Sequence, residues 1–168
     1  MANSKIELQH IDKYLFQICG LPLTNLLPEK ESQAYAAHNF DLGKNKYKYR
    51  SAKITPKKAG QFVTLWFRMS TGIIAPFDVN DDIDFYIIAI RNEKKMGLFI
   101  FPKEILFQRR VLSGHGKEGK RGFRVYPNWD LTISKQAQQT QSWQKLYFLD
   151  LSNENQIDVK KGKCLLGM

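Results

Sequence analysis

The sequence predicts an α/β fold with a mixed central sheet flanked by helices. Two nearly continuous apolar runs, at residues 85–90 and 98–101, are typical of strands buried on both faces. Segments with helical periodicity lie on either side of them in the chain. The 168 residues, of which 43% are hydrophobic, suit one domain with its own core. We therefore expect a single domain over residues 1–168.

The first expected element is a helix over residues 4–19. Ser4 and Glu7 have the spacing of a capping box, and Gly20 and Pro22 would end the helix. Its apolar stripe would consist of Ile6, Ile11, Tyr14, Leu15 and Ile18.

Two strands and a helix are expected next. Residues 36–42 and 46–54 read as strands around a turn at 43–45. Thr55 and Pro56 then predict a helix start, with Thr55 as the N-cap. The inward face of that helix would consist of Phe62, Val63, Trp66 and Phe67.

The second half begins with the two apolar strands, joined by a turn at 92–95. Pro102 would start a short helix, and the glycines of residues 113–122 predict a mobile loop. A strand at 122–126 follows. Ser134 would cap a last helix that ends near Tyr147, and the pattern of the tail, 151–168, predicts no defined element.

Positive charge is concentrated in parts of the chain. There are 26 Lys and Arg residues against 16 Asp and Glu, a net charge of +10. Residues 44–77 contain no acid and eight bases: Lys44, Lys46, Lys48, Arg50, Lys53, Lys57, Lys58 and Arg68. A second cluster contains Lys117, Lys120, Arg121 and Arg124. Such segregation is typical of a polyanion binder, nucleic acid above all. A membrane surface, soluble anions or a merely solvated surface are the alternatives.

Several classes of protein are excluded by missing patterns. No apolar run is long enough to cross a bilayer, and the start of the sequence lacks a secretory signal. Cys19 and Cys164 are too far apart to indicate a disulfide scaffold, and the histidines lack zinc-binding spacing. No phosphate-binding glycine loop or nucleophile motif occurs. We expect a cytoplasmic protein without a metal site.

The segment 53–61 carries the clearest candidate for phosphate contact. If a helix begins at Thr55, Lys57 and Lys58 lie in its first turn, where they oppose the helix dipole. A phosphate bound there would offset that cost. The candidate contacts in this segment are Lys53, Thr55, Lys57, Lys58 and Gln61. The alternative is that the lysines simply point into water.

The last predicted helix is a second candidate. It has five glutamines and no acid, and glutamine and lysine side chains suit groove edges and phosphates. Lys135 and Gln136 at its start, with Arg124 before it, complete the candidate contacts. The alternative is an ordinary polar outer face on a core helix anchored by Trp143 and Tyr147.

One pattern resembles a catalytic site. Asp84 precedes one apolar strand and Lys103 follows the next, so a hairpin would bring them together, and Glu31 could add a carboxylate. Metal-dependent nucleases use carboxylates on Mg²⁺ beside a lysine. Phe101, however, stands two residues before Lys103, where such an enzyme has an acid.

Four blocks of the sequence belong together: the segment from Arg50 to Phe62 with Trp66, Phe101 to Glu104, Arg124 to Asp130, and Ser134 to Phe148. In this order they resemble the MepB family of small bacterial proteins encoded beside a multidrug efflux system. The resemblance covers about residues 30–148. It implies a restriction-endonuclease-like fold that binds DNA, with an incomplete catalytic signature.

The function predicted is therefore DNA binding, to duplex DNA, by a basic phosphate-contacting face beside a degenerate nuclease site. Glu31, Asp84 and Lys103 are its vestigial residues. An active Mg²⁺-dependent endonuclease is the first alternative, and only it would need a cofactor. A basic accessory factor that binds an acidic protein is the second. No membrane partner is expected, and a homodimer is compatible with the sequence.

Overall fold

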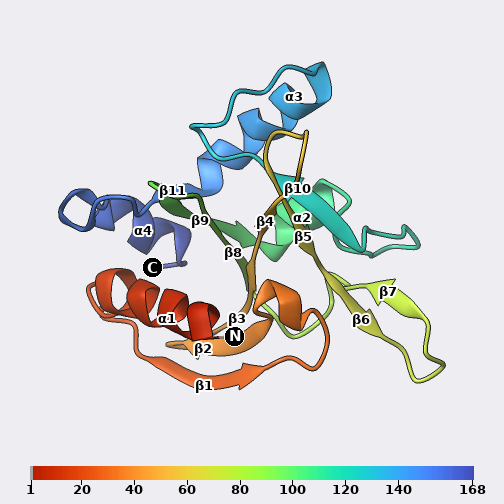
Figure 1. Cartoon of the computed structure of the whole chain (residues 1–168). Helices are drawn as coiled ribbons and strands as arrows, with labels where there is room; N and C mark the ends of the chain where they lie inside the picture. The colour runs from red at the N-terminus through yellow and green to blue at the C-terminus, as the bar shows by residue number, and fades with distance from the viewer. Residues whose placement is uncertain (1) are drawn as a thin grey trace.

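The computed structural model describes residues 2–168, and within them the central feature is a six-stranded sheet (Figure 1). Its strands, in spatial order, are β1 (Leu23–Pro28), β2 (His38–Leu42), β3 (Asn45–Ser51), β8 (Phe85–Arg91), β9 (Met96–Pro102) and β11 (Phe148–Asp150). Neighbours are antiparallel except β3 and β8, which run parallel. The predicted mixed sheet is confirmed.

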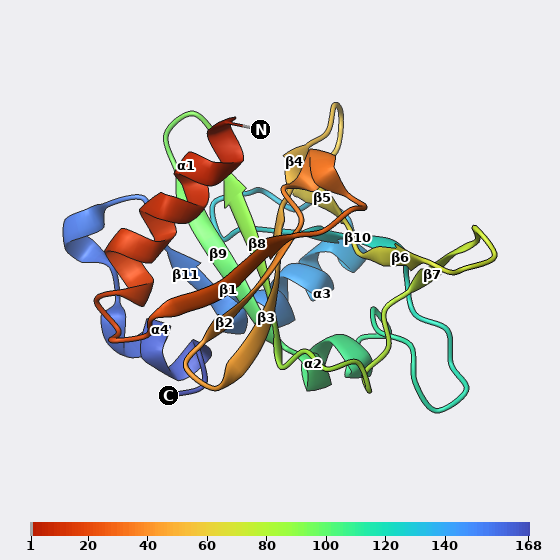
Figure 2. The same ribbon diagram turned by 90° about the horizontal axis from the view of Figure 1, so that it is seen from below.

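Helices cover one face of this sheet. α1 (Ala2–Ile11) continues as one π-helical stretch, Asp12–Phe16, and lies near α4 (Val159–Leu165), as Figure 2 shows. Leu8, Ile11 and Leu15 from the N-terminal helix pack on Tyr47 and Tyr49 of β3. This face holds the first of two apolar cores.

The other face is covered by both strands and helices. β4 (Lys53–Ile54), β5 (Gln61–Thr64) and β10 (Gly122–Val125) form a small second sheet, in the order β10-β5-β4. α2 (Lys103–Gln108) and α3 (Lys135–Gln144) lie beside it. Val63, Leu65, Phe101, Leu106 and Val125 are among the buried members of this second core. The main sheet is thus flanked by helices on both sides, as expected.

A short ribbon projects from the body. It consists of β6 (Trp66–Arg68) and β7 (Ile74–Pro76), which pair antiparallel (Figure 1). Short 3₁₀ turns occupy Gln33–Tyr35, Lys145–Tyr147 and Glu154–Gln156.

The elements with strong local signals are confirmed. The two apolar runs form the β8–β9 hairpin, whose register runs from Phe85 opposite Pro102 to Arg91 opposite Met96. Ser134 caps α3, because its hydroxyl accepts a hydrogen bond from the Ala137 amide at 3.1 Å. The short helix after Pro102 and the strand at 122–125 also form as predicted.

The helix predicted from Thr55 is wrong. Residues 53–64 form the β4–β5 hairpin, with a turn between Ile54 and Gln61. From Gln61 to Thr64 buried and half-buried residues alternate, and β5 pairs with distant β10. The Thr-Pro pair is a local signal, and this non-local pairing overrides it. Of the residues expected to share one helix face, Phe62 and Val63 therefore point to opposite sides of β5, and Trp66 and Phe67 lie on β6.

The N-terminal capping box is also wrong. α1 already begins at Ala2, so Ser4 lies inside the helix. The Glu7 carboxylate instead accepts a hydrogen bond from the buried Tyr49 hydroxyl at 2.6 Å. Ile6 and Ile18, expected on the inward face, are largely exposed.

Two further segments differ from expectation. The strand predicted at 46–54 is divided at Ala52 into β3 and β4, because the Ala52 amide still donates to the Ala89 carbonyl of the main sheet whereas Lys53 and Ile54 pair with β5. The tail contains α4, capped by the Asp158 side chain. In the loop from Ser113 to Gly122, expected to be mobile, the Gly119 amide donates to the Ser113 hydroxyl at 2.8 Å. In the part of the chain described, no helix is both long and apolar enough to cross a membrane.

Candidate nucleic-acid interface

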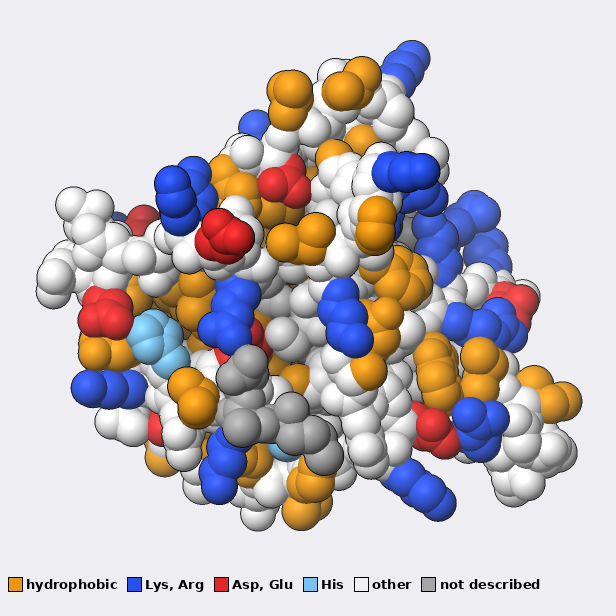
Figure 3. Space-filling view, viewed as in Figure 1, with side chains coloured by type: hydrophobic (Ala, Val, Ile, Leu, Met, Phe, Trp, Pro, Cys, Tyr) orange, Lys and Arg blue, Asp and Glu red, His pale blue; other side chains and the backbone are white. Residues whose placement is uncertain are grey.

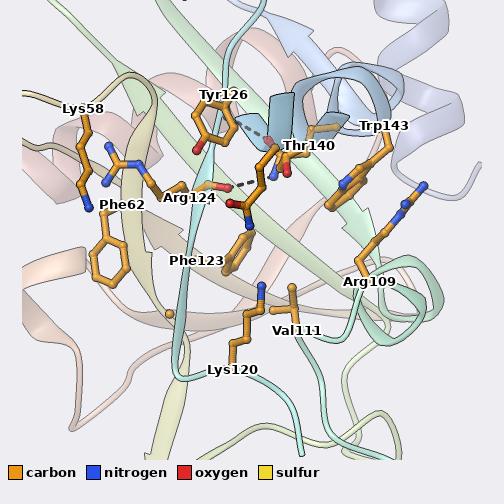
Figure 4. Close-up of a pocket in the computed structure, with 13 residues that line it drawn as sticks. Lys58, Phe62, Arg109, Val111, Lys120, Phe123, Arg124, Tyr126, Thr140 and Trp143 are labelled. Carbon is orange, nitrogen blue, oxygen red and sulfur yellow. Dashed lines mark hydrogen bonds between the residues drawn. The ribbon is translucent and has the colours of Figure 1, made fainter. Parts of the chain in front are cut away.

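A cleft of about 450 Å³ opens between the β4–β5 hairpin, β10, α3 and the chain after α2 (Figure 4). We call it the basic cleft. Its lining side chains come from four segments that are far apart in the sequence. They are Lys58, Phe62, Arg109, Val111, Lys120, Gly122, Phe123, Arg124, Tyr126, Gln136, Thr140, Trp143 and Gln144. The fold, not a local motif, therefore assembles the cleft.

The charge of this lining is of one sign. Among the described residues that line the basic cleft, four are cations and none is an acid. The cations are Lys58, Arg109, Lys120 and Arg124. Figure 3 shows Lys and Arg side chains gathered on the side of the molecule below α3. A concave surface lined by one sign of charge raises the local concentration of anions.

Aromatic side chains form much of the wall. Phe62, Tyr126 and Trp143 are half-buried, and Phe123 lies at the floor with 8% of its surface exposed. The Arg109 guanidinium lies over the Trp143 ring, 5.1 Å from its centroid. The cleft thus combines apolar rings with a cationic rim (Figure 4).

Arg124 of β10 holds the β4–β5 turn in place. Its guanidinium donates to the Thr55 hydroxyl at 2.9 Å and to the carbonyls of Ala59 and Gly60 at 2.9 and 3.1 Å. Gly60 adopts a φ of +75°, and a Cβ there would lie 2.6 Å from the Tyr126 ring. The turn is therefore fixed by Arg124 from one strand and by the close approach that only glycine permits.

The predicted contact residues of segment 53–61 are only partly brought together. Lys58 lines the cleft, and exposed Lys57 lies in the same turn with a φ of 67°. Thr55 accepts from Arg124 instead of capping a helix. Lys53 lies outside the lining, with its ammonium 4.8 Å from the centre of the Tyr35 ring. Gln61 is buried and donates to the Arg91 carbonyl at 3.1 Å.

α3 presents its glutamines to two different environments. Gln136 lines the basic cleft, and Lys135 lines a neighbouring hollow that shares Arg109 and Trp143 with it. Gln144 is fully buried: its amide accepts from the Tyr126 amide at 2.8 Å and donates to the Arg124 carbonyl at 3.0 Å. Gln144 thereby pairs with the free edge of β10 as a neighbouring strand would.

Two further glutamines hold the segment before α3. Gln141 donates to the carbonyls of Pro127 and Asp130, both at 2.9 Å, and Gln138 donates to the Thr132 carbonyl at 3.1 Å. The structural alternative therefore applies to three glutamines of this helix, and a nucleic-acid contact stays a prediction for Gln136. Gln138, Gln141 and Gln144 are structural, whereas Gln136 faces the cleft.

Sequence reasoning missed several lining residues. Arg109 follows α2 and had no pattern that could mark it, since only the fold brings it to Trp143. Lys120 belongs to the second basic cluster, which was a usable signal. A bond from its amide to the Val111 carbonyl, at 2.9 Å, fixes its place at the cleft.

The carboxylates of the nuclease alternative do not assemble. Asp84 and Lys103 do meet, through a bond from the Lys103 amide to the Asp84 carbonyl at 3.1 Å. The Asp84 carboxylate, however, accepts from the Lys46 amide, and Glu31 pairs with Arg68. In residues 2–168 no three acidic, His or Cys side chains form a group that could hold a metal. Both carboxylates of the nuclease alternative are therefore engaged by other groups of the protein.

Phe101 is part of the second core. It is fully buried, and its ring lies 5.5 Å from those of Phe99 and Trp143 and 5.8 Å from that of Tyr147. The position that would carry an acid in a nuclease is thus used here to anchor α3 and the segment after it.

A buried ion network on β3 was not predicted. Lys48 and Arg50 face the second core, while Tyr47 and Tyr49 face the first. Glu29 accepts from Lys48 at 2.5 Å and from Arg50 through its other oxygen. In the sequence, Lys48 and Arg50 counted only among the eight bases of residues 44–77, but both faces of this strand are covered.

Burial perturbs the charged groups of this network. Desolvation lowers the pKa of Lys48, and the nearby Glu29 carboxylate partly opposes that shift. Arg50 also donates to the carbonyls of Thr64 and Tyr49, at 3.2 and 2.9 Å. Paired and fully hydrogen-bonded, the network ties β3 to β5 and to the segment after β1.

The fold and site together define a mixed α/β protein. Beside its small second sheet lies a cleft whose described lining contains cations and no acid. The chain belongs to the MepB-like family, whose family model matches residues 29–150. The family expected from the sequence is confirmed.

Comparison with solved structures agrees. A crystal structure of MepB is 36% identical, covers 91% of this chain and 99% of its own, and has a TM-score of 0.77. A bacterial homing endonuclease, I-Ssp6803I, is 13% identical, with 91% and 88% coverage and a TM-score of 0.42. No curated protein matches the chain.

Proposed function

We propose that this protein binds duplex DNA through the basic cleft, without cleaving it. The observation that carries the proposal is that one cleft has cations on its rim, aromatic rings on its wall and no acid among its described residues. Phosphates would contact Lys58, Lys120 and Arg124, and the exposed lysines Lys57 and Lys135 would extend the contact along the backbone.

In this proposal, the absence of cleavage follows from the state of the residues that would form a nuclease site. Phosphoryl transfer needs charge fixed at the reacting phosphate. Asp84 and Glu31 are engaged by Lys46 and Arg68, and Phe101 is buried. The protein would therefore act in the cytoplasm as a metal-independent binder, in accord with what the family resemblance implies.

Charge reversal at the cleft tests the proposal. Lys58→Glu with Lys120→Glu should abolish binding of a labelled duplex, measured by fluorescence anisotropy. Lys94→Glu with Lys160→Glu is the matched control, since both residues are exposed, lie outside the cleft lining and change the net charge equally. Equal loss in both pairs would show that net charge, not the cleft, governs binding.

Nuclease activity is tested separately by plasmid nicking with Mg²⁺ and Mn²⁺. The proposal predicts no cleavage. Metal-dependent nicking that disappears in Asp84→Ala would favour the endonuclease alternative.

A further inference from the structure

The basic cleft is shaped for more than phosphates. Cations alone would suffice for backbone contact, and an open surface would serve. Here the cations surround a hollow of about 450 Å³ whose wall is aromatic. Pockets of this size that combine apolar walls with a few polar groups are typical of sites for planar organic ligands.

The polar groups that face the hollow suit a nucleobase edge. Gln136 and Thr140 of α3 line it with amide and hydroxyl groups, and neither takes part in the bonds that hold the segment before α3. Such groups can donate to and accept from the exposed edge of an unpaired base.

The Arg109–Trp143 pair is a ready stacking surface. The guanidinium lies 5.1 Å from the ring centroid, and the Trp143 ring is held from behind by Phe101, at 5.5 Å between centroids. Unpaired bases stack on aromatic rings and on guanidinium planes in known modes of recognition. This pair also lines the neighbouring hollow, so the two hollows adjoin at Arg109 and Trp143.

We propose that the basic cleft receives one unpaired base of a DNA duplex, with the flanking phosphates on Lys58 and Lys120. This inference rests on the proposed function and specifies its ligand. The Arg109–Trp143 pair is one stacking surface and suits a single base, whereas binders of single strands present successive stacking surfaces along a groove. Taking up an already unpaired base costs less unstacking energy than extruding a paired one.

The test compares three labelled DNAs: a fully paired duplex, the same duplex with one bulged nucleotide, and the single strand. The bulged duplex should bind roughly tenfold more tightly than the paired one, the gain expected from one stacked base. With 2-aminopurine at the bulge, binding should change the fluorescence of that base.

Thr140→Trp should fill the hollow while leaving every rim cation in place. It should abolish the preference, so that the bulged and paired duplexes bind with equal affinity. Ser142→Trp, on the same helix but in the neighbouring hollow, is the matched control and should keep the preference. A circular dichroism melt shows that both variants are folded.

Equal affinity for paired and bulged duplexes, or a preference that survives Thr140→Trp, overturns the inference and leaves the proposed function standing. Tightest binding of the single strand also overturns it. If none of the three DNAs binds, the proposed function fails as well.

Discussion

Arg124 donates a hydrogen bond to the Thr55 hydroxyl at 2.9 Å, and this bond joins β10 to the turn that carries Lys57 and Lys58. The two residues are 69 positions apart in the chain. The same guanidinium reaches the Ala59 and Gly60 carbonyls. Arg124 therefore acts on the basic cleft in two ways, as a charge on its rim and as the group that fixes the opposing turn.

Substitution of Arg124 separates these two roles. Arg124→Lys keeps the charge but cannot donate to three acceptors in a fixed planar geometry. We expect a several-fold loss of DNA affinity and a loss of about 1–2 kcal/mol in unfolding free energy, since hydrogen bonds to a charged group are worth about that much. Anisotropy titration and urea unfolding measure the two effects. Wild-type affinity in Arg124→Lys would show that only the charge matters.

The buried network predicts a large effect at Glu29. Glu29→Gln leaves Lys48 and Arg50 buried without their counter-charge, which costs about 3–5 kcal/mol. Glu31→Gln is the matched control, because its pair with Arg68 is partly exposed and such pairs contribute about 0–1 kcal/mol. Urea unfolding of both variants checks this. Similar losses in the two would contradict the importance assigned to the network.

Alkaline pH should destabilise the fold through buried tyrosines. Burial raises the pKa of Tyr47 from 10.0 to about 12, and its hydroxyl donates to the Leu166 carbonyl at 2.7 Å. Between pH 10 and 12 the unfolded chain loses this proton while the folded chain keeps it. Stability therefore falls as pH rises, by about 1.4 kcal/mol per pH unit for each such group.

Tyr47→Phe tests this directly. Between pH 10 and 12, the unfolding free energy of the variant should fall less steeply with pH than that of the wild type. The two slopes should differ by about 1.4 kcal/mol per pH unit, the contribution of one proton. Urea unfolding at steps of half a pH unit gives the slopes. Tyr14→Phe, at a half-buried position on the N-terminal helix, is the control. A wild-type slope in Tyr47→Phe would contradict the assignment.

The elements of the fold that depend on local sequence patterns could be predicted from the sequence. The apolar runs of β8 and β9 and the Ser134 cap of α3 depend on neighbours within a few residues. The β4–β5 hairpin could not be predicted, because Thr55 and Pro56 favour a helix locally. Pairing of β5 with β10, about sixty residues later, decides the outcome.

The candidate site divides in the same way. Charge clustering named Lys58 and Arg124 as candidate contacts and placed Lys120 in a basic cluster, and in the fold all three line one cleft. It could not reveal that Gln61 is buried or that Lys48 and Arg50 form ion pairs with Glu29. Arg109 has no sequence signal, since its partner Trp143 lies 34 residues later and meets it only in the folded chain.

The salt dependence of DNA binding tests the central claim most directly. If Lys58, Lys120 and Arg124 of the cleft and the exposed Lys57 and Lys135 each neutralise a phosphate, log Kd plotted against log salt should have a slope of about 4.5 in magnitude, and Lys58→Ala should lower it by about 0.9. Anisotropy titrations of one duplex between 50 and 200 mM salt, roughly the range over which such contacts weaken, supply the slope. A slope near zero, or one unchanged in Lys58→Ala, would contradict binding through this cleft.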